Sequence, residues 1–318
     1  MTALISGSVA IDTLLASPFP FELDASQVDA KRLAVSYFMP DMRQVWGGCA
    51  ANIAYALKQL GGDPLVLATV GDDDAAYRQR FAALGLRSEG LKTIAGTFTA
   101  KAVIMSDNLG QQITGFHPGA MGHAHAQTIA SVLTTKHHLT WGIVSPDGKE
   151  AMLQRCAELK ALKIPFIADP GQALPILDAS DLRTMIDGAS LIAVNEHEAV
   201  MMASKLGKNA SELSHSIAVL ETLGDKGLNF WQVGQCTHIA AIAGVSAVDP
   251  TGCGDSLRGA VLYALTLGWS WLDALRLGNL MGAHVVQSAG AQTYTINLGD
   301  LKALWVKHYP EPYPTPAS

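Results

Sequence analysis

The densest chemical signal in the sequence is the run Asp-Pro-Thr-Gly-Cys-Gly-Asp at residues 249–255, directly before a long apolar stretch. At a helix N-terminus, the backbone amides of Gly252, Cys253 and Gly254 would form an anion site, because free N–H groups and the positive end of the helix dipole favour phosphate oxygens. The carboxylate of Asp255 would repel an anion there, but it could accept the proton of a hydroxyl that attacks phosphorus. The alternative is that Asp255 only caps the helix, as Asp often does.

Two clusters near the N-terminus could hold a polyhydroxylated ligand. Asp12 ends the apolar run 3–11, and a carboxylate at such a strand end could accept two hydrogen bonds from vicinal hydroxyls, as on a ribose. Gly48, after Gly47, would let the backbone approach a ligand closely, and Asn52 offers both a donor and an acceptor. In the alternative interpretation Asp12 is a satisfied turn residue, the glycines form only a turn, and Asn52 only starts a helix.

Two segments in the second half of the chain have a structural and a functional interpretation. Asn195 and Glu198 have the spacing of a capping box, which by itself explains both residues. Thr222 to Gly227 lies between two apolar runs and could be a simple turn. The chain has neither the Gly-x-x-x-x-Gly-Lys-Ser/Thr loop of P-loop NTPases nor the Gly-x-Gly-x-x-Gly turn of dinucleotide-binding proteins after its first strand.

The elements that must position these residues alternate along most of the chain. Apolar runs typical of buried strands are separated by stretches with helical periodicity, which predicts a mostly parallel sheet covered on both faces. The expected strands are 3–11, 65–70, 141–144, 165–168, 191–194 and 217–220, and the expected helices include 52–60, 149–162 and 256–267.

Residues 14–45 and 97–117 do not fit this alternation. The first segment is interrupted by three prolines and shows no lasting helical period, whereas the second alternates around an Asp-Asn-Leu-Gly turn at residues 107–110, as a hairpin does. We expect the two segments to form a small β-rich lid, and residues 1–13, 46–96 and 118–318 to form the α/β domain.

Composition excludes several classes of protein. Of the 318 residues, 49% are hydrophobic and 16% are charged, which supports a sizeable core. The formal net charge of −6 gives no basic surplus for nucleic acid. The four cysteines are too few and scattered for a disulfide framework and form no Cys-x-x-Cys pair. With no signal-peptide pattern and no apolar run long enough to span a membrane, a cytoplasmic protein is expected.

The run at 249–255 resembles the C-terminal signature of the ribokinase (PfkB) family of sugar and nucleoside kinases. Four other stretches resemble family motifs in the same order, so the resemblance covers most of the chain: Gly7-Ser8 with Asp12, Gly47 to Asn52, Asn195 to Glu198, and Thr222 to Gly227. The signature departs from its commonest form at Pro250, Cys253 and Leu257, but both glycines and Asp255 are present.

The resemblance implies a ribokinase-like α/β/α domain with a lid, and it assigns roles to the residues above. Asp255 would be the general base, with the amides of residues 252–254 stabilising the transferred phosphoryl group. Ser8, Asp12, Gly48 and Asn52 would bind the substrate, and Asn195, Thr222, Gly224 and Gly227 would bind ATP. Glu198 would orient Mg²⁺ through water. A K⁺ ion near Asp249 and a homodimer are left open.

Several stretches resemble most closely the bacterial adenosine-type nucleoside kinases of the family. They are the signature itself, Gly47 to Asn52, and Phe-His-Pro-Gly-Ala-Met at residues 116–121. This implies phosphorylation of the 5′-hydroxyl of a purine nucleoside, with Ser36 and Gln172 as further candidates for contacts to the base or ribose. Lid aromatic residues such as Phe116 could stack on a base. The alternatives are a ribose or other sugar kinase and a non-catalytic ligand-binding or regulatory protein.

Overall fold

The computed structural model describes residues 1–21, 28–29, 32–33, 35–135 and 137–315. Within these residues the main sheet has nine strands in the order β15-β14-β13-β12-β11-β10-β1-β6-β7. The strands β13, β12, β11, β10, β1, β6 and β7 pair in parallel. Strands β14 and β15 add an antiparallel edge next to β13. The bounds are β1 Thr2–Ser6, β6 Asp63–Val70, β7 Leu91–Thr93, β10 Leu139–Val144, β11 Phe166–Ala168, β12 Leu191–Asn195, β13 Ala218–Thr222, β14 Leu228–Gln232 and β15 Gln235–Ile239.

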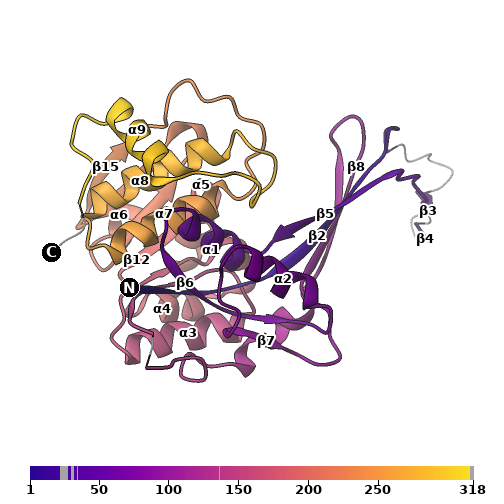
Figure 1. Cartoon of the computed structure of the whole chain (residues 1–318), viewed down its shortest axis with the longest axis horizontal. Coiled ribbons are helices and arrows are strands. Elements are labelled where there is room, and N and C mark those ends of the chain that lie inside the picture. The colour runs from indigo at the N-terminus through magenta and orange to yellow at the C-terminus, as the bar shows by residue number, and fades with distance from the viewer. Residues whose placement is uncertain (22–27, 30–31, 34, 136, 316–318) are drawn as a thin grey trace.

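Helices cover both faces of this sheet, and each face has its own apolar core. Alternation along β1 decides which side chain enters which core: Ala3 and Ile5 pack on one face, and Leu4 packs on the other. One face carries α1 (Cys49–Gln59), α2 (Ala75–Ala83), α7 (Cys253–Thr266), α8 (Trp271–Val285) and α9 (Leu298–His308). The opposite face carries α3 (Lys149–Ala161), α4 (Ala179–Ile186), α5 (Glu196–Leu206) and α6 (Ala210–Leu213), and Figure 1 shows α3 and α4 on the side away from α8 and α9.

A second, smaller sheet projects away from the main one (Figure 1). Its strand order is β5-β2-β8-β9, with bounds Ala10–Ala16 for β2, Asp41–Gly47 for β5, Lys101–Ser106 for β8 and Gln112–His117 for β9. Strands β8 and β9 form the hairpin expected around the turn at 107–110. Beyond β2 and β5, Val28–Asp29 (β3) pairs with Arg32–Leu33 (β4). The α/β sheet with an additional small β-rich sheet confirms the expected fold class.

The prediction of one strand over residues 3–11 is wrong. The strand β1 ends at Ser6, and the chain re-enters strand structure at Ala10 in the other sheet, so Asp12 lies inside β2 rather than at a strand end of the main sheet. Gly7 has φ 157°, and a Cβ on it would lie 2.0 Å from Ser145 Oγ. The break between β1 and β2 therefore depends on a tertiary contact, and the continuous apolar run in the sequence gives no sign of it. Strands β2 and β5 also continue across the expected lid boundaries at residues 13 and 46.

Two helices that carry predicted site residues begin three residues earlier than expected. The helix α1 starts at Cys49 rather than 52, and α7 starts at Cys253 rather than 256. Each follows a glycine with positive φ, 92° at Gly48 and 78° at Gly252. Asp255 consequently lies in the first turn of α7, and its backbone is helical.

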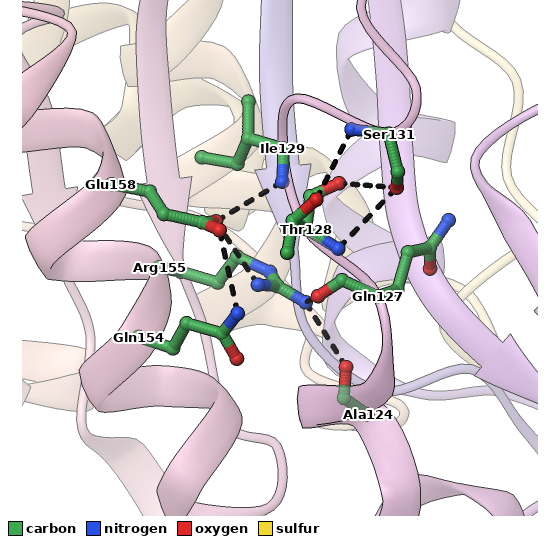
Figure 2. Close-up of polar contacts among 8 residues, drawn as sticks. All are labelled: Ala124, Gln127, Thr128, Ile129, Ser131, Gln154, Arg155 and Glu158. Carbon is green, nitrogen blue, oxygen red and sulfur yellow. Dashed lines mark hydrogen bonds and ion pairs between the residues drawn. The ribbon is translucent and has the colours of Figure 1, made fainter.

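A buried arginine holds the segment after the small sheet against α3. Arg155 is 2% exposed and donates through Nη2 to the carbonyls of Ala124, at 3.0 Å, and Gln127 (Figure 2). Its Nη1 donates to Glu158 at 3.0 Å, and Glu158 also accepts from the amide of Ile129 at 3.1 Å. The 3₁₀ helix η1 (Gly119–Ala126), which follows β9, is thereby tied to the main domain.

None of the helices in the described part of the chain combines the length and the apolar character that a membrane span needs.

Candidate active site

The first turn of α7 forms the centre of the candidate site. Gly252 is the N-cap, and a Cβ on it would lie 2.4 Å from Cβ of Ala291, so the close approach of the two loops requires glycine. The amide of Cys253 donates to the carbonyl of Pro250 at 3.2 Å. The amide of Gly254 precedes the first intrahelical hydrogen bond of α7, which Ser256 makes to Gly252 at 2.8 Å. The backbone amides of Gly254 and Asp255 are therefore the groups of this turn best placed to bind an anion.

The Asp255 carboxylate projects from this turn toward α1. Its Oδ2 accepts a hydrogen bond from Nδ2 of Asn52 at 2.8 Å. Burial raises the pKa of Asp255 above its usual value, and this increase is opposed by the hydrogen bond from Asn52, by the nearby charge of Arg258 and by a hydrogen bond from the Cys49 thiol. The raised pKa makes the Asp255 carboxylate more basic than an exposed aspartate, and the same hydrogen bonds and charge stabilise its ionised form. Both properties suit a proton acceptor.

A buried ion pair fixes the start of α7 to the main sheet. Arg258 Nε lies 2.6 Å from Asp169 Oδ2, and Nη2 donates to Oδ1 at 3.0 Å. The same guanidinium donates through Nη1 to the carbonyl of Gly254 at 3.2 Å. Burial raises the pKa of Asp169 to about 7 although the charge of Arg258 lowers it. Asp169 directly follows β11, so the pair joins the carboxyl end of that strand to the candidate anion site.

The predicted substrate residues Ser8, Asp12 and Gly48 meet where the two sheets join. Ser8 Oγ accepts the amide of Cys49 at 3.1 Å, and a Cβ on Gly48 would lie 2.5 Å from the carbonyl oxygen of Ser8. Asp12 Oδ1 accepts the amide of Ala102 at 3.1 Å, and burial raises the pKa of Asp12 above its usual value. One oxygen of Asp12 is therefore engaged by the small sheet, while the residue stays half-exposed.

The other three predicted substrate residues have different surroundings. Asn52 is buried and uses both ends of its amide inside the protein, because Oδ1 accepts from Gln292 Nε2 at 2.9 Å while Nδ2 donates to Asp255. Gln172, in the 3₁₀ helix η2 (Gly171–Ile176), lies with its Nε2 3.9 Å from the sulfur of Cys49 and so belongs to the same neighbourhood. Ser36 is exposed in the segment between β4 and β5, and no hydrogen bond among the described residues connects it to the others.

The predicted ATP-binding residues occupy the carboxyl ends of β12 and β13. Asn195 and Thr222 are register partners in these neighbouring strands. The expected capping box is present, because Asn195 Oδ1 accepts the amide of Glu198 and Glu198 Oε2 accepts the amide of Asn195, both at 2.8 Å. Gly224 begins a 3₁₀ turn (Gly224–Lys226) and Gly227 follows it, with φ values of 61° and 98°. The charge of Glu198 raises the pKa of Asp255, so the capping box lies close to the α7 turn.

The acidic residues of the site differ in what they could offer to a cation. Among the described residues, no group of three or more His, Cys, Asp and Glu side chains is placed to hold a metal ion. Glu198 is half-exposed in the first turn of α5, just after the end of β12, which suits a carboxylate that holds a hydrated Mg²⁺, since Mg²⁺ keeps several waters and uses substrate phosphates as ligands. Asp249 instead accepts the amides of Thr251 and Gly290, both at 2.9 Å, and joins two loops beside the α7 turn.

Comparison with known proteins agrees with this arrangement. The model of the pfkB family carbohydrate kinases matches residues 23–297. The chain belongs to the pfkB family. A structure of Burkholderia thailandensis nucleoside kinase in complex with inosine superimposes with a TM-score of 0.85 at 36% identity, covering 98% of this chain and 99% of that one. A second structure of that enzyme, in complex with ADP-inosine, has a TM-score of 0.83 at 37% identity and covers 98% and 97% of the two chains.

Curated relatives of this pfkB-family chain include both nucleoside and sugar kinases. The nucleoside kinase of Methanocaldococcus jannaschii is 29% identical over 259 residues, which are 80% of this chain and 83% of that protein. The ribokinase of Bacillus subtilis is 26% identical over 249 residues, or 77% and 83% of the two chains. Both classes of substrate are therefore represented among its relatives.

Sequence reasoning missed four residues that hold the site of this pfkB-family chain together: Tyr77, Asp169, Arg258 and Gln292. All four are buried. Arg258 carried one detectable signal, a charge inside an otherwise apolar helix one turn after Asp255. Gln292 and Tyr77 carried none, because each acts through a partner distant in sequence.

Proposed function

We propose that this pfkB-family chain is an ATP-dependent nucleoside kinase that phosphorylates the 5′-hydroxyl of a purine nucleoside, adenosine or a similar one. The observation that carries the proposal is the Asp255 carboxylate, which lies in the first turn of α7 directly after Gly254 and accepts a hydrogen bond from Asn52. The similarity to proteins named nucleoside kinases, one of them with bound inosine, supports the choice of a nucleoside.

In this proposal Asp255 accepts the proton of the 5′-hydroxyl as the hydroxyl oxygen bonds to the γ-phosphorus of ATP. The bond from that phosphorus to the bridging oxygen breaks, and ADP leaves with the electron pair. The Gly254 amide and the positive end of α7 stabilise the charge on the transferred group. Because burial raises the pKa of Asp255, the carboxylate is a better proton acceptor than an exposed aspartate.

The nucleoside would lie where the two sheets meet. Ser8 lies at this junction between β1 and β2, Asp12 lies in β2, and Gly48 is the N-cap of α1. Asp12 would accept hydrogen bonds from the ribose hydroxyls, and Gln172 would contact the ribose or base. Phe98 and Phe116 are 62% and 53% exposed at the ends of the small sheet, where they could stack on a base. The small sheet would then act as a lid that excludes water during transfer.

ATP would bind along the carboxyl ends of β12 and β13. Asn195, Thr222, Gly224 and Gly227 are assigned to this side, with the open space at Gly224 allowing a ligand to approach the backbone. Glu198 would hold Mg²⁺ through water, and Mg²⁺ supplies charge neutralisation on the phosphates when bound. The loop that contains Asp249 is the place to look for a K⁺ effect, although both carboxylate oxygens of Asp249 already accept backbone amides.

The decisive experiment measures ADP and nucleotide product with adenosine, inosine, guanosine, cytidine, ribose and fructose, for the wild type and Asp255→Asn. We expect turnover with purine nucleosides and a loss of at least about a hundredfold in kcat in the variant, because Asn cannot accept the proton. Circular dichroism and nucleoside binding by calorimetry should show that the variant is folded and still binds substrate.

The other outcomes separate the alternatives. Turnover with ribose or fructose but not with nucleosides would make the chain a sugar kinase and contradict the nucleoside assignment. Nucleoside binding without turnover in the wild type would favour a non-catalytic ligand-binding or regulatory protein. Full activity of Asp255→Asn would overturn the role of Asp255 while leaving the kinase class intact.

A further inference from the structure

A continuous hydrogen-bond chain connects the loop after α8 with the Asp255 carboxylate. Gln292 Nε2 donates to Asn52 Oδ1 at 2.9 Å and to the hydroxyl of Tyr77 at 3.5 Å. Asn52 Nδ2 donates to Asp255 Oδ2 at 2.8 Å, and the Tyr77 hydroxyl donates to the carbonyl of Gly47 at 2.6 Å. Tyr77, Gln292 and Asn52 are only 0%, 5% and 6% exposed, so these bonds are shielded from competition with water.

The directions of the two bonds that link Gln292, Asn52 and Asp255 follow from the charge on Asp255. An ionised carboxylate only accepts, so Asn52 must turn its nitrogen toward Asp255 and its oxygen toward Gln292. Gln292 must then present its nitrogen to that oxygen. The two ends of an asparagine amide have nearly the same shape, and packing alone does not choose between them. The orientation of Asn52 is therefore fixed from both sides, by the Asp255 carboxylate that accepts from its nitrogen and by the Gln292 donor that satisfies its oxygen.

We propose that Gln292 is a positioning residue for phosphoryl transfer, which holds the Asn52 amide in the orientation that aligns Asp255 and keeps it ionised. This inference rests on the proposed function, because it takes Asp255 to be the proton acceptor. It also changes the main role of Asn52, which the sequence assigned to substrate binding. The Asn52 oxygen is occupied by Gln292, and only the second hydrogen on its nitrogen is left for a ligand.

The loop holds Gln292 in place independently of its side chain. The backbone carbonyl of Gln292 accepts from Arg80 Nη2 at 2.9 Å, and the neighbouring Ala291 packs against the N-cap glycine of α7. A substitution that keeps the size of the side chain should therefore remove the donor without moving the loop.

Several titratable groups surround Asp255, and all of them stay unchanged in such a variant. They come from α1, from the end of β11, from α5, from α7 itself and from the segment after α8, and they are Cys49, Asp169, Glu198, Cys253, Arg258 and Tyr294. A shift in the pH profile of the variant therefore reports on the hydrogen bond from Asn52, which lowers the pKa of Asp255.

The test is Gln292→Met, which retains the length of the side chain and lacks a donor. We expect kcat to fall about tenfold, equivalent to about 1.4 kcal/mol of transition-state stabilisation, while KM for the nucleoside changes little. The acidic limb of the kcat–pH profile should move to higher pH, since Asp255 loses a partner for its ionised form. The matched control is Gln287→Met, because Gln287 is exposed and its side chain donates within its own segment, to the carbonyl of Ala283 at 2.8 Å.

A double-mutant cycle separates a relay through Asn52 from a general structural effect. In an Asn52→Ala background the relay is already broken, so Gln292→Met should cause no further loss of kcat. Gln292→Leu repeats the single-variant measurement with a different shape. Thermal unfolding and nucleoside calorimetry verify that each variant is folded and binds substrate.

An unchanged kcat in Gln292→Met, a change in KM alone, or an equal loss in both backgrounds would each overturn the inference. These failures differ from a failure of the proposed function. If Asp255→Asn is inactive and the Gln292 variants behave like the Gln287 control, only the positioning role is wrong. If Asp255→Asn retains activity, the assignment of the base itself is wrong.

Discussion

Asp147 illustrates at the scale of one residue how burial changes the behaviour of a carboxyl group. It is 4% exposed, accepts the amide of Gly148 at 2.8 Å, and lies too far from a cation to form an ion pair among the described residues. Burial raises its pKa to about 7. The Gly148 hydrogen bond and the charge of Arg155 both lower the pKa, but by less than burial raises it. The folded chain therefore keeps a proton on Asp147 at pH values where the unfolded chain has released it.

We predict that Asp147→Asn stabilises the protein at pH 8 but not at pH 4. As pH rises from about 4 to about 7, the unfolded state ionises Asp147 and the folded state does not, so the wild type loses up to about 4 kcal/mol of stability that the variant keeps. Urea unfolding at several pH values measures the difference, with Asp41→Asn on the exposed start of β5 as the control. A difference between Asp147→Asn and wild type that is constant with pH would contradict the prediction.

At this scale the sequence identified residues whose chemistry is encoded locally. Asp255, the glycines beside it, and the Asn195–Glu198 capping box depend on neighbours within a few positions, and the capping box is present as its spacing predicts. The buried partners could not be found in this way. Arg258 meets Asp169, and Gln292 meets Asn52, only after the chain has folded.

At the scale of elements, the start of α1 depends on Gly48, whose neighbours leave no space for a side chain. A Cβ on Gly48 would lie 2.5 Å from the Ser8 carbonyl oxygen, 2.6 Å from Cα of Val9 and 2.7 Å from the amide nitrogen of Ala10. These are backbone atoms at the break between β1 and β2, which cannot turn aside as a flexible side chain can. The start of α1 and the crossing between the sheets therefore constrain each other.

We predict that Gly48→Ala lowers the free energy of unfolding by about 2 kcal/mol or more, because the clash adds to the strain of a positive φ. Gly61→Ala, at the other end of α1, provides the comparison. Its φ is 82° but nothing lies within 4 Å of the added carbon, so we expect a loss of about 1 kcal/mol from backbone strain alone. Scanning calorimetry of both variants tests this order, and equal losses would show that the contacts of Gly48 do not matter.

The elements themselves were largely predictable, and their errors have a common cause. Alternation and helical periodicity located the strands at 65–70, 141–144, 165–168, 191–194 and 217–220 to within a few residues. The mistakes lie at Gly7, Gly48 and Gly252, where a positive φ ends or starts an element. A glycine in sequence permits such a conformation, but a tertiary contact decides whether it is used.

At the scale of the whole molecule, the two sheets differ in how deeply they are buried. Every residue of β1 is buried, whereas every residue of β9 is exposed. The small sheet also exposes large apolar side chains, including Met42 at 69% and Ile113 at 44%. Few contacts thus oppose local opening of this sheet.

We predict that backbone amides of β8 and β9 exchange with solvent faster than those of β1 and β12. Addition of nucleoside and ADP should slow exchange in β2 and β8, if the small sheet closes over the substrate as proposed. Hydrogen–deuterium exchange with mass spectrometry measures both effects, and the amides of α9, far from the junction of the sheets, serve as the reference. Equal protection of β9 and β1 without ligand would contradict the difference in local stability.

In the proposed mechanism, the contacts of Asp255 also determine when activity first appears as the chain folds. Asn52 and Asp255 are separated by 203 positions in the chain, and Gln292 and Asn52 by 240. During synthesis, α1 and the strands up to β13 leave the ribosome before the residues that complete the proposed catalytic arrangement exist. Such long-range contacts close late, since the entropy of a large loop must be overcome first. Recovery of activity should therefore come no earlier than the packing of α1 against α7 when the denatured chain refolds, and later than secondary structure.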